Sequence, residues 1–82
     1  MMIKLSEKER KAVKEALEYI GYFDVAESPE MLQEWFDDGT IDIGTGRSGR
    51  DAVWIITESH ESAVYIDTLE HLSQEEITKE FL

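Results

Sequence analysis

The spacing of apolar residues changes from helical to strand-like at Thr40, and this change constrains the fold more than any other feature of the chain. Before Thr40, apolar residues recur every three to four positions, as they do on one face of a helix. After Thr40, three short runs are rich in β-branched and aromatic residues. Short hairpin connections join the runs, so the strands are expected to pair antiparallel.

Two helices are predicted before Thr40. The first spans residues 6–20, where the capping box Ser6-x-x-Glu9 precedes an apolar face and a glycine follows it. The second starts at Ser28-Pro29-Glu30, because serine caps a helix and proline suits its first position, while an acidic residue complements the positive end of the dipole. It is expected to end at Asp37-Asp38-Gly39.

Three strands and a last helix are predicted from Thr40 onward, with the strands over residues 40–43, 52–57 and 63–67. The middle strand is apolar on both faces and is therefore expected to lie in the centre of the sheet. The helix spans 73–81, where a second capping box, Ser73-x-x-Glu76, coincides with a hydrophobic staple of two flanking apolar residues (Leu72 and Ile77).

The predicted order is ααβββα, which is an α+β fold: two N-terminal helices packed on a small antiparallel three-stranded sheet, with a short C-terminal helix. Eighty-two residues support one modest core, so a single compact domain over residues 1–82 is expected. The chain has no cysteine, and no apolar run approaches the ~20 residues of a membrane helix. No secretory signal pattern is visible, and a cytoplasmic location is expected.

The excess of acidic residues restricts the kinds of macromolecule that this protein can bind. The chain carries 19 acidic and 8 basic residues, for a formal net charge of −11. Between Glu15 and Thr78 there are sixteen carboxylates and two cations, Arg47 and Arg50. Such a field repels nucleic acid and anionic membranes, and attracts basic surfaces over ~8–10 Å. The leading hypothesis is a non-enzymatic regulator or inhibitor that docks on a basic site of another protein.

A concrete form of this hypothesis is a phage-encoded inhibitor of a nucleic-acid-binding effector, of the anti-CRISPR or anti-restriction kind, acting in the host cytoplasm. Its carboxylates would stand in for phosphates along a strand, at ~6–7 Å spacing. Direct contact with nucleic acid or membrane is not expected, and both a monomer and a homodimer fit the sequence. The candidate partner-binding residues are Glu30, Glu34, Asp37, Asp38, Asp42, Arg47 and Arg50.

The stretch Gly44–Gly49 has the pattern G-x-G-x-x-G, which raises an alternative function, the binding of an anion or a nucleotide. In a dinucleotide site this motif opens a helix, whereas here a strand pattern follows it. The expected structure is therefore a hairpin connection between Ile43 and Ala52, with Arg47 and Ser48 at its tip. A small anion- or nucleotide-binding module using the Gly44–Arg50 loop is the alternative function.

A third hypothesis is a structural or dimerisation module whose charge serves solubility only. Tyr19, Tyr22 and Phe23 are hard to bury together, so part of that cluster or the C-terminal Phe81-Leu82 is a candidate contact patch. No motif for catalysis is present, and His60 and His71 lie outside metal-ligand spacing. No enzyme activity, cofactor or metal is therefore expected.

Overall fold

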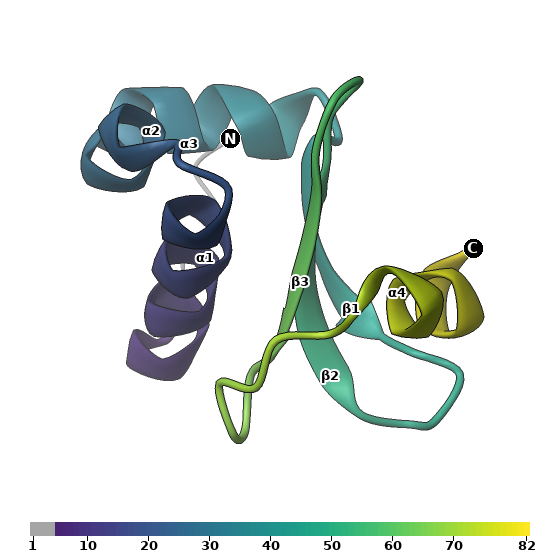
Figure 1. Ribbon diagram of the computed structural model, residues 1–82. Coiled ribbons are helices and arrows are strands. Elements are labelled where there is room, and N and C mark those ends of the chain that lie inside the picture. Colours follow the sequence, from purple (N-terminus) through teal and green to yellow (C-terminus); the bar gives the residue numbers. More distant parts are fainter. Residues whose placement is uncertain (1–4) are drawn as a thin grey trace.

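The computed structural model describes residues 5–82 and confirms the predicted α+β fold (Figure 1). Three N-terminal helices precede a three-stranded antiparallel sheet, and one helix follows it in the described range. In chain order the elements are α1 (Glu7–Tyr19), α2 (Phe23–Glu27), α3 (Pro29–Asp37), β1 (Ile41–Thr45), β2 (Asp51–Ile56), β3 (Glu61–Tyr65) and α4 (Gln74–Phe81).

Side-chain caps start the helices where the sequence predicts them. Both capping boxes form: the Ser6 hydroxyl accepts a hydrogen bond from Glu9 N at 3.1 Å, and the Ser73 hydroxyl accepts one from Glu76 N at 3.2 Å. Ser28 caps α3 in the same way, with Pro29 at the first helical position. These bonds satisfy backbone N–H groups that have no partner within the helix.

The short helix α2 was not predicted. It is a little more than one turn long, too short for an apolar periodicity, and its N-cap residue Tyr22 provides no side-chain cap. The strand ends also differ from the prediction: β1 continues through Thr45, whereas β3 ends at Tyr65. The longer β1 places the glycine-rich turn beyond the end of the sheet.

The sheet has the order β1-β2-β3, so β2 is the central strand as predicted. Alternate side chains point to opposite faces, and both faces are covered. One face packs against α1 through Ile41, Val53, Ile55 and Val64. The other packs against α4 through Ala52, Ala63 and Tyr65. Figure 1 shows α1 and α4 on opposite sides of the sheet.

The short helix α4 is held to the sheet by its apolar face. Ile77 is buried beside Leu72, the two residues of the predicted staple. The Phe81 ring stacks on Trp54 of β2, with 5.1 Å between ring centroids and 9° between planes. This docking brings the C-terminal end of α4 next to the turn between β1 and β2.

Candidate functional site

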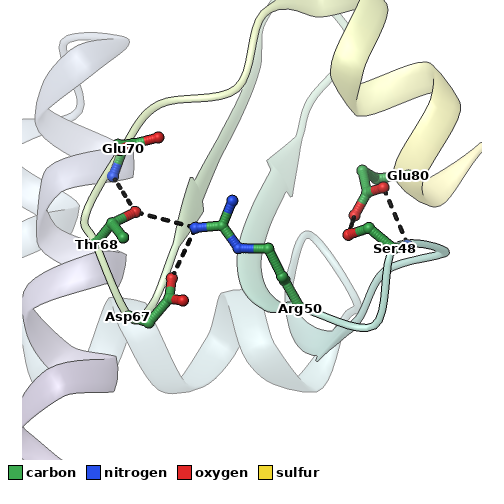
Figure 2. A network of polar contacts seen from close by, with 6 residues as sticks. All are labelled: Ser48, Arg50, Asp67, Thr68, Glu70 and Glu80. Carbon is green, nitrogen blue, oxygen red and sulfur yellow. Dashed lines mark hydrogen bonds and ion pairs between the residues drawn. The ribbon is translucent and has the colours of Figure 1, made fainter.

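The tip of the β1–β2 hairpin is hydrogen-bonded to Glu80 of α4 (Figure 2). Ser48 donates to the Glu80 carboxylate twice, from its backbone N to Oε1 at 3.2 Å and from its hydroxyl to Oε2 at 2.7 Å. Arg47 N donates to the Glu80 carbonyl oxygen at 3.2 Å. The loop donors that the sequence offered to an external anion therefore bind a carboxylate of the same chain.

Gly46 explains how α4 comes so close to the hairpin. It is buried, and a Cβ atom built on it would overlap the Glu80 carboxylate. Gly49 has a φ of +86°, the left-handed region that glycine adopts at no steric cost. Two glycines of the G-x-G-x-x-G stretch thus serve a tight turn and a helix contact.

Arg50 is also engaged within the chain (Figure 2). Its Nη2 atom lies 3.0 Å from Asp67 Oδ1 and 3.2 Å from Thr68 Oγ1, and its guanidinium carbon lies 3.6 Å from the centroid of the Tyr65 ring. The hydrogen bond to Asp67 raises the pKa of Arg50, and the same bond lowers the pKa of Asp67. Arg50 therefore anchors the turn after β3.

Arg47 differs from Arg50. Its side chain is exposed and forms no ion pair within residues 5–82. The structure thus separates the two candidate arginines into one that is held internally and one that is available at the hairpin tip.

Three of the candidate carboxylates form a stripe on α3. Glu30, Glu34 and Asp37 are spaced i, i+4 and i+7, which places them on one side of the helix, and all three are exposed. We call these three residues the α3 acidic face. Within the described part of the chain none of them forms an ion pair, although Asp37 accepts a hydrogen bond from Gln33 Nε2 at 2.8 Å.

The other two candidate carboxylates are bonded to the backbone. Asp38, which follows the stripe, accepts a hydrogen bond from Thr40 N at 2.9 Å, and hydrogen bonding by Thr40 lowers the pKa of Asp38. Asp42 accepts one from Ile43 N at 2.8 Å. Since Ile41 and Ile43 point to the α1 core, Asp42 points to the opposite face of the sheet. Asp38 is thus the C-cap of α3, next to Asp37 in the chain, whereas Asp42 lies on β1, away from the α3 acidic face.

The negative end of α3 carries acidic residues. The last turn includes Glu34 and Asp37, Asp38 is the C-cap, and no basic residue is present there. Carboxylates at a helix C-terminus oppose the helix dipole, which typically costs ~0.3–1 kcal/mol per charge at the surface. Helix stability therefore does not account for the acidic residues at this end of α3.

Sequence reasoning missed Glu80 and Asp67, the partners of the hairpin. Ser48 and Glu80 are separated by 32 positions and Arg50 and Asp67 by 17, so no local pattern links them. Trp35 of α3 is half-buried: it packs against the core and also lines a hollow between α2 and α3. The exposure of Tyr19 and Phe23 agrees with the expectation that their cluster is hard to bury.

No family model, curated protein or solved structure matches this chain. Within residues 5–82, no group of three or more histidine, cysteine, aspartate or glutamate residues is arranged to hold a metal ion. None of the helices in the described range is long and apolar enough to cross a membrane. The function is therefore inferred from the arrangement of charges and rings on the surface.

Proposed function

We propose that this protein is a small non-enzymatic binding protein whose α3 acidic face docks on a basic surface of a partner protein. The observation that carries this proposal is the shortage of internal ion pairs. Within residues 5–82, Arg50 pairs with Asp67, and the other close contact of this kind is between His71 Nε2 and Glu15 Oε2 at 3.6 Å. With 19 acidic and 8 basic residues, at least eleven carboxylates have no cation in the chain to pair with. The three carboxylates of the α3 acidic face form no ion pair within residues 5–82, and they can pair with external cations.

The geometry of α3 supports a row of closely spaced cations as the target. A helix rises 1.5 Å per residue, so Glu30 and Glu34 are ~6 Å apart along the axis and Asp37 is ~4.5 Å further on. The first step is close to the ~6–7 Å between phosphates of an extended strand. We therefore propose a nucleic-acid-binding protein as the partner, with the carboxylates occupying its phosphate sites.

The charge of the whole molecule supports binding to protein rather than to nucleic acid. Four of the eight basic residues lie on α1, namely Lys8, Arg10, Lys11 and Lys14, and the span from Glu15 to Thr78 is strongly acidic. An acidic surface speeds encounter with a basic partner and makes the association sensitive to salt.

The experiment compares two variants with the same net charge. Glu34→Gln/Asp37→Asn removes two charges from the α3 acidic face, and the control Glu7→Gln/Glu75→Gln removes two exposed charges from α1 and α4. Tagged proteins are incubated with a panel of purified nucleic-acid-binding proteins in ~50 mM and ~500 mM salt, a range over which screening lengths shorten severalfold.

We expect wild type and control to capture a basic partner at low salt, and the α3 variant to bind it about tenfold more weakly, since each lost charge pair is worth a few-fold in affinity. Capture should fall sharply at high salt. Equal losses in both variants, or capture that salt does not change, would contradict the proposal.

A further inference from the structure

A hollow of about 330 Å³ lies between α2 and α3, on the side of the sheet away from α4. Three aromatic residues line it, Tyr22, Phe23 and Trp35, together with Met31 and the carboxylate residue Asp24. The Tyr22 and Trp35 rings meet edge to face, with 5.2 Å between centroids and 71° between planes. This contact fixes the two rings relative to each other.

We infer that this hollow, which we call the aromatic hollow, binds the cationic side chain of an arginine or lysine from the protein partner. Aromatic faces attract cations, and the attraction is strongest where several rings surround the charge. Asp24 is exposed in the lining and can accept a charge-assisted hydrogen bond from a guanidinium or ammonium group. The lining thus supplies both kinds of group that recognise an organic cation.

Within residues 5–82, the lining of this hollow contains no lysine or arginine. His60 lies outside the lining and contacts the Tyr22 ring edge to face, with 5.7 Å between ring centroids. Arg47 and Arg50 lie beyond the other end of the sheet, in the turn that leads from β1 to β2. Meanwhile the Phe23 side chain remains 57% exposed and Met31 38% exposed, so two large apolar residues of the lining are uncovered.

Charge selects a cation over a second copy of this chain as the occupant. Two copies that met at this hollow would bring together Asp24 and the acidic residues of α3 from each molecule, in a protein that already carries a net charge of −11. An incoming arginine or lysine instead neutralises Asp24 while its aliphatic stem covers Phe23 and Met31.

The aromatic hollow adjoins the proposed binding surface, and this inference rests on the proposed function. Met31 and Trp35 of the lining are the neighbours in sequence of Glu30 and Glu34 of the α3 acidic face. A basic partner seated on that face therefore has the hollow within reach of one long side chain. The hollow would supply an anchor, and the acidic face the long-range attraction.

The test is a titration of ¹⁵N-labelled protein with N-acetyl-arginine amide, followed by NMR. The two indole N–H signals report on opposite faces of the sheet, because Trp35 lines the hollow and Trp54 stacks on Phe81 of α4. The neutral control ligand is N-acetyl-citrulline amide, which has the shape of arginine without its charge.

We expect the Trp35 indole signal to shift and saturate with a Kd of ~1–10 mM, the range of a single side-chain contact. The Trp54 signal should stay in place, and the citrulline ligand should produce less than one fifth of the shift. No saturable shift of Trp35, equal shifts of both indoles, or equal binding of the citrulline ligand would each overturn the inference.

Matched variants locate the contact. Phe23→Leu and Asp24→Asn should each weaken binding about threefold, in line with the loss of one ring face or one charge. Tyr19→Leu is the control, because Tyr19 is 69% exposed and lies outside the lining. Unchanged binding by the first two variants, in proteins whose Trp54 signal is unperturbed, would contradict the assignment.

The titration tests the aromatic hollow and the capture experiment tests the proposed function, so either claim can be contradicted without the other. If arginine amide does not bind while capture still depends on the α3 acidic face, the aromatic hollow is wrong and the proposed function stands. If arginine amide binds at Trp35 while capture is independent of the α3 carboxylates, the cation site stands and the proposed function is wrong.

Discussion

The carboxylate of Glu80 accepts two hydrogen bonds from Ser48, and its backbone carbonyl accepts a third from Arg47 N. These are the donors that an anion-binding loop would present to a phosphate. With Glu80 in place, an external anion has to displace it and then bind within a protein of net charge −11. The glycine-rich hairpin is thus bound to α4.

Gly46 is the residue that allows this contact, and Gly46→Ala tests it. The added Cβ would displace the Glu80 side chain and break its bonds to Ser48, so we expect a loss of about 1 kcal/mol in the free energy of unfolding. Gly44→Ala is the control, because a Cβ there meets nothing within 4 Å. In urea unfolding, equal stability of the two variants would refute the contact.

Asp67 provides a pH prediction. The hydrogen bond from Arg50 holds the pKa of Asp67 below its ordinary value in the folded protein. As pH falls, the Asp67 carboxylate is therefore protonated in the unfolded chain before it is protonated in the folded one. The stability from this pair is therefore present at neutral pH and is lost as pH falls below ~4. Asp67→Asn should flatten this acid limb of the stability–pH curve. Parallel curves for wild type and Asp67→Asn would show that the pair contributes nothing.

At the scale of the elements, α4 matters more than its eight residues suggest, because it carries both Phe81 against Trp54 and Glu80 against the hairpin. Its start depends on the capping box of Ser73 and Glu76. Hydrogen bonds with the backbone and side chain of Ser73 lower the pKa of Glu76. Anything that frays α4 should therefore loosen the hairpin as well.

Ser73→Ala tests this coupling. We expect a loss of about 1 kcal/mol of stability, the usual effect of removing an N-cap, and faster hydrogen exchange at the amides of Arg47 and Ser48. Ser6→Ala removes the matching cap of α1 and should cost a similar amount without selectively exposing these two amides. Unchanged protection of the hairpin amides in Ser73→Ala would contradict the coupling.

The elements that could be predicted from sequence are those with local chemical signals. Caps and periodicity located α1, α3 and α4, alternation located β1, and runs of β-branched and aromatic residues located β2 and β3. The helix α2 has neither signal, and the Glu80 contact joins residues far apart in the chain. The acidic stripe on α3 follows from helical spacing. The separation of Asp42 follows from the alternation with Ile41 and Ile43, a signal that was present in the sequence.

At the scale of the whole molecule, the charge is a cost to folding. Like charges repel in the folded state, and the described residues offset this only through the Arg50–Asp67 ion pair and the contact between His71 and Glu15. Acidic residues at the negative end of α3 add to that cost. Acidic residues that reduce stability in this way are expected where a protein retains them for binding.

Neutralising the α3 acidic face should therefore not destabilise the protein. We expect Glu34→Gln/Asp37→Asn to raise the midpoint of thermal unfolding by ~1–4 °C, as a gain of a few tenths of a kcal/mol does in a domain of this size. The control Glu7→Gln/Glu75→Gln removes carboxylates from the favourable ends of α1 and α4 and should show a smaller gain or a loss. A lower midpoint for the α3 variant than for the control would assign these carboxylates a structural role.

The central claim is that the α3 acidic face binds a basic partner through charge, and the salt dependence of that affinity tests it most directly. The slope of log Kd against log salt concentration reports how many charge contacts the complex makes. For a partner obtained by capture, we predict a steep slope for wild type and for Glu7→Gln/Glu75→Gln, and a clearly shallower slope for Glu34→Gln/Asp37→Asn. The same slope for all three proteins would contradict the claim.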